Sequence, residues 1–335
     1  MVNEINMKKI KFIAILNIII FGVVVISKNS LAQDVQDVPK GFSMSPFFQE
    51  VNLAKDQNSS SFALEISNNT PESAVLKLSV VDFGALDETG GVAFLGSAED
   101  LKNKYSLASW VSLEKDAVVL EAGEKQSVKV TIENKDSLSP GGHYAAVMAK
   151  MEKDNNGTGS ESSIVAVDPS FASLVFVRKI SGEIFGLNLK SIEKSDSTFS
   201  LAKTSHLRFQ NTGNVHVTPR GIVKVVDPIG REVSRGIINE ESSLVLPETF
   251  RVLPVTLKDV AIAFVPGKYT TNVEYRFDGK DDFEVIQQSS YFFPIKIILI
   301  IIVAMLLVML GWKKFAKRIS QKQNETKQNK KGSKK

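Results

Sequence analysis

The sequence predicts an all-β fold, with two tandem β-sandwich domains followed by one C-terminal transmembrane helix. Apolar and polar residues alternate through most of the chain from Phe47 to Phe283, and clusters rich in glycine, proline, asparagine and aspartate interrupt the alternation. A period of two is typical of strands with one buried face, and many short strands between turns favour a sandwich. A long apolar run near the C-terminus predicts the helix.

The chain begins with a pattern typical of secretion. Three lysines precede an apolar run at residues 12–26, and small residues follow at Ser30 and Ala32. This order of basic, apolar and small-residue regions predicts a signal peptide over residues 1–32, cleaved after Ala32. An uncleaved N-terminal anchor is the alternative, although the apolar run is short for a membrane span.

Residues 33–180 are predicted to form the first domain. The stretches SFALEIS, VLKLSVVDF and QSVKVTIEN alternate apolar with polar side chains, and turn sequences such as NNTPES and EAGEK lie between them. The polar segment at residues 152–163 lies between two strand-like stretches, HYAAVMAKM and SIVAVDPSFASLVFV. We therefore expect this segment to be the loop of a long hairpin within the first domain.

Residues 181–290 are predicted to form the second domain, with the same alternation in HLRFQN, GIVKVVD and GKYTTNVEYRF. Both domains enter a late strand through a glycine followed closely by a tyrosine, at residues 141–144 and 267–269. A tyrosine often begins a late strand in immunoglobulin-like sandwiches. This weak internal repeat therefore favours two related immunoglobulin-like domains.

Residues 291–312 are predicted to cross a membrane. No charged side chain interrupts the run from Ile297 to Leu310, and aromatic residues flank it on both sides. A hydrocarbon core of roughly 30 Å needs about 20 such residues, and aromatic residues are typical of its two borders.

The tail that follows, residues 313–335, has ten lysines or arginines against one glutamate. The positive-inside rule places such a tail in the cytoplasm, so the predicted topology is single-pass type I with both domains outside. Binding of the tail to nucleic acid or acidic lipid is the less favoured alternative.

The exported part is acidic, because the basic residues concentrate at the two ends of a chain whose formal net charge is +4. An acidic ectodomain argues against nucleic acid as a partner. The chain has no cysteine, so its domains are held together by their cores without disulfides. Many animal surface domains of this size use disulfides, and their absence favours a bacterial envelope, with a single membrane.

One polar stretch, RFQNTGNVHVTPRG at residues 208–221, permits two interpretations: a ligand site, or two strands joined by a turn. Asparagine and glycine in NTGN are typical turn residues, and alternation in VHVT places His216 on the face opposite the two valines. We favour the structural interpretation. His216, Thr218 and Arg220 remain as a candidate partner-binding face beside an edge strand.

The sequence predicts no enzyme. It has three histidines, no cysteine, and none of the patterns H-E-x-x-H, G-x-S-x-G or S-x-x-K with K-T-G. The acidic stretch DGKDDF is more typical of a hydrated hairpin tip than of a cation site. We predict no catalytic residue, no metal site and no cofactor. A pair of glycosidase carboxylates, which only geometry reveals, leaves a wall-acting enzyme as a third possibility.

A tryptophan, a G-E-x-x-x-V stretch and a P-G-G-x-Y turn follow one another in the first domain, at Trp110, Gly123, Glu124, Val128, Pro140, Gly141, Gly142 and Tyr144. This order resembles the WxL-interacting proteins of bacterial cell surfaces. The resemblance implies an immunoglobulin-like, pilus-chaperone-like first domain, a second β-sandwich, one C-terminal span and a basic tail. It also implies a surface scaffold whose first domain associates with peptidoglycan and whose second associates with protein or host ligands.

We therefore expect a membrane-anchored bacterial surface protein that binds cell-wall polymer, namely peptidoglycan, or another surface protein, without catalysis. The alternative is a membrane-tethered assembly chaperone for surface subunits, which would bind them through an exposed edge strand.

Overall fold

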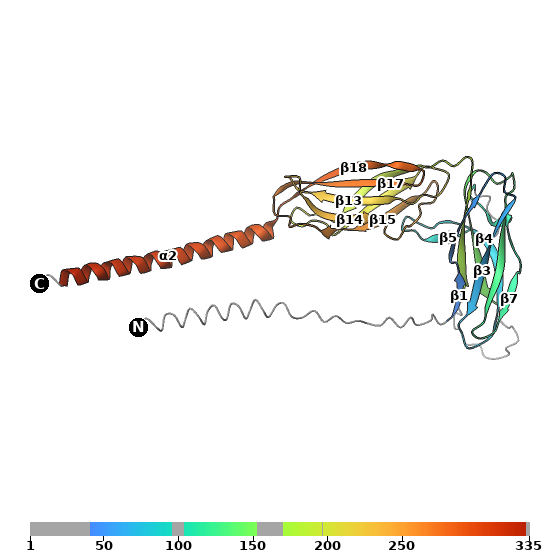
Figure 1. Ribbon diagram of the computed structural model, residues 1–335, viewed down its shortest axis with the longest axis horizontal. Helices are drawn as coiled ribbons and strands as arrows, with labels where there is room; N and C mark the ends of the chain where they lie inside the picture. Colours follow the sequence, from blue (N-terminus) through green and yellow to red (C-terminus); the bar gives the residue numbers. More distant parts are fainter. Residues whose placement is uncertain (1–40, 96–103, 153–169, 196, 333–335) are drawn as a thin grey trace, which may run out of the picture. The chain divides into compact units, whose positions relative to one another are not determined.

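The computed structural model describes residues 41–95, 104–152, 170–195 and 197–332. The predicted signal peptide, residues 1–32, lies outside the described residues, as does nearly all of the predicted loop at residues 152–163. The described chain is built from strands that form four sheets, followed by one long C-terminal helix (Figure 1). The predicted all-β fold of two tandem sandwiches with a C-terminal helix is confirmed.

The first sandwich has two sheets. One has the strand order β1-β3-β8-β6, and the other has the order β2-β10-β9-β4, with β5 and β7 both paired to β4. The strands are β1 (Phe42–Ser45), β2 (Phe48–Leu53), β3 (Ser59–Asn68), β4 (Ala74–Ala85), β5 (Val92–Phe94), β6 (Val111–Leu113), β7 (Ala117–Leu120), β8 (Lys125–Glu133), β9 (Gly141–Met151) and β10 (Ser170–Lys179), with a short 3-10 helix, η1 (Ala108–Trp110), before β6. The chain passes from the first sheet to the second at Pro46, between β1 and β2.

The core of the first sandwich follows from the alternation of its strands. β3 and β8 pair in antiparallel register, with Leu64 opposite Val128. Leu64, Ile66, Val128 and Val130 are fully buried, while the polar residues between them point outward. Burying an aliphatic side chain of this size contributes about 1.5–3 kcal/mol, so this register is strongly favoured over a shift by one residue.

β9 and β10 form the predicted hairpin. They pair in antiparallel register over their length, from Gly141 opposite Lys179 to Lys150 opposite Ser170. The two strands are the centre of the second sheet, because β4 lies on the other side of β9 and β2 lies beside β10.

The second sandwich also has two sheets, with the orders β11-β12-β15 and β16-β14-β13-β17-β18. Its strands are β11 (Leu187–Lys194), β12 (Thr204–Asn211), β13 (Arg220–Val226), β14 (Glu232–Ile238), β15 (Phe250–Thr256), β16 (Lys258–Asp259), β17 (Gly267–Phe277) and β18 (Lys280–Phe292). The long strands β17 and β18 lie side by side in Figure 1. Phe209, Val223, Val273 and Tyr275 are among its fully buried core residues.

In each sandwich, an asparagine at the end of a strand hydrogen-bonds the backbone of a neighbouring segment. The Asn68 amide, at the end of β3, donates to the carbonyl oxygens of Leu120 (3.1 Å) and Glu121 (3.1 Å). The Asn211 amide, at the end of β12, donates to those of Val215 (2.8 Å) and Val245 (2.8 Å). Both side chains tie a strand end to a distant loop, so the two sandwiches share a structural corner as well as a fold.

The second sandwich has two distinct ends. At one end is the β17–β18 turn, where a Cβ on Gly279 would lie 2.4 Å from the Phe185 ring, next to the start of β11. At the other end β18 finishes at Phe292, and the helix α2 (Ile295–Gly332) begins only three residues later. The segment Ile295–Lys313 of α2 is long and apolar enough to cross a membrane.

Candidate functional site

The residues predicted as a partner-binding face are His216, Thr218 and Arg220, and only Arg220 lies at the surface. His216 and Thr218 are buried, at 0% and 4% exposure, whereas Arg220 is exposed. Thr218 donates its backbone N–H to Asp278 (2.8 Å), and the Arg220 guanidinium pairs with the same carboxylate (2.9 Å). These three side chains therefore do not form one exposed face, and a partner contact at Arg220 stays a prediction.

His216 does not lie on the exposed face that alternation indicated, because the segment around it packs on the first sandwich. The Tyr144 hydroxyl accepts a hydrogen bond from the His216 N–H (3.0 Å) and lies 3.2 Å from Nδ1 of its ring. Nε2 of the same ring lies 3.3 Å from Glu50 on β2. With the hydroxyl donating to Nδ1, the proton of a neutral His216 lies on Nε2 and is donated to Glu50.

We call these contacts, together with those of Asn214, the junction between the sandwiches. The Gly142 N–H donates to the Asn214 carbonyl oxygen (2.8 Å), and the Asn214 amide donates to the carbonyl of Gly182 (3.0 Å). Gly141 has a φ of +118°, and a Cβ there would lie 2.7 Å from the Asn214 oxygen. The P-G-G-x-Y turn is therefore used to bring the second sandwich against the first.

The junction alters the acidity of its own groups. The hydrogen bond from His216 holds the pKa of Glu50 below its ordinary value, and nearby Arg178, 3.3 Å from the same carboxylate, adds to this. Burial raises the pKa of the Tyr144 hydroxyl well above its ordinary value. Glu50 is therefore an anion and Tyr144 a neutral hydroxyl at neutral pH, which matches the hydrogen bonds that the two groups make.

Next to the junction, the first sandwich has an apolar outer face on its sheet β2-β10-β9-β4. We call this the apolar face: its fully or nearly buried members are Phe83, Tyr144, Ala146 and Phe176, and its half-buried members include Phe48, Val81, Met148, Ala172 and Leu174. Leu244 and Leu246 of the second sandwich pack against part of it. The half-buried members leave apolar surface at the outside of a sheet whose other face is already packed on the core.

A strand edge borders the apolar face. β2 pairs with β10 only from Leu174 to Lys179, whereas β9 pairs with β10 from Ser170 onward. The Leu174 N–H points away from β9 and donates to the Phe47 carbonyl (2.8 Å). Backbone groups alternate sides along a strand, so the N–H and C=O of Ala172 point to the same outer side. Among the described residues, no strand pairs with β10 at this open edge, residues 170–173.

Neither the apolar face nor the open edge was predicted from the sequence, although a signal for the apolar face exists. In HYAAVMAKM and FASLVFV most residues are apolar at both odd and even positions, and these point to opposite faces of a strand. This indicates that both faces of the strands are covered. A sandwich strand with one face in water alternates more strictly, as β8 does.

The described residues hold no group of three or more histidines and carboxylates arranged to bind a metal ion. His143 is buried, and its two ring nitrogens face the carbonyl oxygens of Ser106 (3.1 Å) and Ser139 (2.8 Å). Burial lowers its pKa. His143 therefore has the environment of a residue that fixes a turn, while the absence of a catalytic, metal or cofactor site stays a prediction.

Comparison with known proteins gives a likeness of fold. No family model matches the chain, and no curated protein matches it, so the resemblance to WxL-interacting proteins stays a prediction. A chain of the chaperone–tip adhesin complex of CFA/I fimbriae is 13% identical with a TM-score of 0.39, covering 75% of this chain and 98% of that one. The class 5 fimbriae chaperone CfaA is 14% identical with a TM-score of 0.39, covering 74% and 99%.

A chain of the SafA pilin–SafB chaperone complex of Salmonella enterica is 10% identical with a TM-score of 0.36, covering 75% of this chain and 96% of that one. At these values the likeness concerns the fold alone.

Proposed function

We propose that this chain is a membrane-tethered assembly chaperone that holds a surface subunit by strand addition, without catalysis. The observation that carries the proposal is the open edge of β10 beside the apolar face. A partner strand at this edge gains backbone hydrogen bonds from Ala172, and its alternate side chains reach the half-buried Met148 and Leu174. The proposal depends on this edge and not on the likeness to solved chaperones.

An open edge beside apolar surface needs a partner. Unpaired N–H and C=O groups next to exposed apolar side chains invite pairing with other chains, and proteins protect such edges with charge, proline or a covering segment. The residues of β10 along the open edge, SFAS, include no charge and no proline. β1 lies beside them, with the Phe42 ring stacked on that of Phe171 and the Ser173 hydroxyl donating to the Pro46 carbonyl (2.6 Å), but the backbone of β1 pairs with β3 and not with β10. The edge is therefore suited to hold a strand of another protein.

In the proposed function, α2 anchors this site at a membrane. Its apolar segment Ile295–Lys313 is followed by the basic tail, so the proposed orientation has the sandwiches outside and the tail in the cytoplasm. Protease added to intact cells should then digest both sandwiches and leave a membrane-bound tail fragment. Digestion of the tail with protection of the sandwiches would contradict this orientation.

The edge itself is tested by removing one N–H. Ala172→Pro deletes the donor that points outward and leaves the ladder to β9 intact, because the Ala172 N–H does not face β9. A photo-crosslinking phenylalanine analogue at Met148 of the full chain, in its own cells, reports what lies on the apolar face. We expect a discrete crosslinked surface protein in the parent chain, and its loss in Ala172→Pro.

Two controls make this result specific. Ala172→Val enlarges the side chain and keeps the N–H, so it should retain the crosslink. Ser127→Pro places the same substitution at an open edge of the other sheet, on the part of β8 beyond its pairing with β6. Equal crosslinking in Ala172→Pro and Ser127→Pro would contradict strand addition at β10. Crosslinks to wall fragments in place of a protein would favour the peptidoglycan-binding scaffold, and release of soluble wall fragments would favour an enzyme.

A further inference from the structure

The end of the second sandwich next to α2 carries exposed apolar side chains on three separate loops. The loop before β12 has Phe199 (55% exposed), the β13–β14 loop has Ile229 (64%), and the loop before β17 has Ile262 (73%) and Phe264 (49%). We call these four residues the loop patch. Large aliphatic and aromatic side chains that are exposed together in this way mark an interaction surface.

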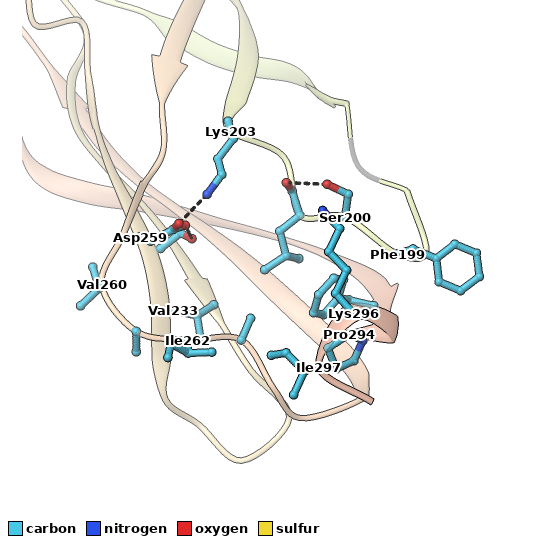
Figure 2. A pocket seen from close by; sticks show the side chains of 15 residues that line it. Phe199, Ser200, Lys203, Val233, Asp259, Val260, Ile262, Pro294, Lys296 and Ile297 are labelled. Atoms are coloured by element: carbon cyan, nitrogen blue, oxygen red, sulfur yellow. Dashed lines mark hydrogen bonds and ion pairs between the residues drawn. The ribbon is translucent and has the colours of Figure 1, made fainter. Parts of the chain in front are cut away.

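The loops of the patch lie at the same end as the start of the helix. The Phe293 N–H donates to the carbonyl of Thr198 in the first loop (2.6 Å), and a Cβ on Gly267, the first residue of β17, would lie 2.9 Å from Pro228 in the second. A pocket of about 520 Å³ opens between the third loop and the first turn of α2. Figure 2 shows Val233 and Ile262 facing Pro294 and Ile297 across this pocket, while Phe199 points away from it.

The opposite end of the same sandwich has a different composition. Its β17–β18 turn continues into the charged residues Lys280, Asp281 and Asp282, and the stretch after β14 reads NEESS at residues 239–243. This end also exposes Ile184 before β11 (62%), but the two stretches named here are polar and charged, whereas three loops next to α2 expose large apolar side chains.

We propose that the loop patch lies in the headgroup region of the bilayer that α2 crosses, so that the second sandwich is seated on the membrane surface. Only Phe293 and Pro294 separate β18 from the helix, so the patch has no linker with which to move away from the bilayer. Apolar side chains on loops bury themselves at the boundary between headgroups and acyl chains, with nearby cations facing phosphates. Lys296 at the pocket supplies such a cation. Arg231, which lies over the Phe264 ring at 4.4 Å, is already paired with Asp227 (2.7 Å). This inference depends on the membrane span of the proposed function.

The chain has no cysteine, which permits a direct test with single nitroxide labels. The full chain in lipid nanodiscs is labelled at Ile262→Cys or, in a second variant, Ile229→Cys. Collision rates with oxygen, which concentrates in lipid, are compared with those of a water-soluble nickel chelate. We expect oxygen collisions to dominate at both loop positions. The matched control is Ile237→Cys on β14, also an exposed isoleucine of this sandwich (54%), where the chelate should dominate.

A fourth label, at Leu306→Cys in the middle of the apolar segment of α2, separates the two proposals. If position 306 is in lipid while positions 262 and 229 collide with the chelate as position 237 does, the span stands and the seating of the loops is overturned. If position 306 is itself in water, the span fails. Spin–spin broadening at position 262, with both reagents excluded, would show that a second copy of the chain covers the patch, which also overturns membrane seating.

Discussion

Removal of the Tyr144 hydroxyl should open the junction between the sandwiches. The ring is 2% exposed, and its hydroxyl is the hydrogen-bond acceptor of the His216 N–H at 3.0 Å. In Tyr144→Phe the ring still fills its place, so no large cavity forms, but a buried N–H loses its partner. Leaving such a donor unsatisfied costs about 1–3 kcal/mol.

This cost converts to a measurable rate. The exchange of the His216 amide with deuterium requires the junction to open, and 1–3 kcal/mol corresponds to about a 5- to 140-fold increase in the opening constant. Hydrogen exchange of the full chain in nanodiscs, read by mass spectrometry on the peptide that contains His216, gives this factor directly. The change should be local, since the cores of both sandwiches keep all their contacts.

The control is Tyr269→Phe in the second sandwich. Tyr269 is equally buried, at 1% exposure, and its hydroxyl donates to the carbonyl of Val265 (2.7 Å), away from the junction. This variant should lose stability without a selective change at His216. Unchanged exchange at His216 in Tyr144→Phe, or the same change in both variants, would refute the assignment of the junction to this hydroxyl.

Three further predictions concern the same chain. The folded pKa of Glu50 lies below its ordinary value of 4.5, so its contribution to the stability of the junction is present above that pH and is lost as the pH falls through the folded value. The opening constant at His216, which is the measured exchange rate divided by the intrinsic rate at the same pH, should therefore rise below about pH 4.5, and Glu50→Gln should remove this dependence. Asn211→Ala should lower the free energy of unfolding in urea by about 1–3 kcal/mol, because it leaves buried carbonyls without a donor, whereas Asn188→Ala at an exposed position should change it little. Gly141→Ala should lower the melting temperature more than Gly123→Ala: both glycines have positive φ, but only the first would bring its Cβ against another residue, and equal losses would contradict this.

The fold was predictable because its signal is repeated in every strand. The alternation in HLRFQN predicted a strand with one buried face, and Leu207 and Phe209 on that face are both fully buried. The hairpin of β9 and β10 was expected from two strand-like stretches around a polar segment. Each alternating strand gives this information locally, so no knowledge of distant contacts was needed.

The candidate site was much less predictable, because it depends on contacts between distant segments. Alternation placed His216 away from the core of its own sandwich, but it carries no information that Tyr144, 72 residues earlier, would cover that side. Asn211 was interpreted as turn chemistry, and it also bonds Val245, 34 residues away. The open edge of β10 is equally invisible in the sequence, because it depends on where the pairing with β2 stops.

The connection between β18 and α2 also determines how the second sandwich would carry tension. A pull on the helix enters at Phe292, while the first sandwich is attached at the opposite end, where Phe185 lies beside the β17–β18 turn. The force then runs along β18, whose hydrogen bonds to β17 are perpendicular to it from Gly267 opposite Phe292 to Phe277 opposite Lys280. These bonds are loaded together in shear and do not open one after another. The strand that leads into the apolar helix α2 therefore has the geometry that resists mechanical extension.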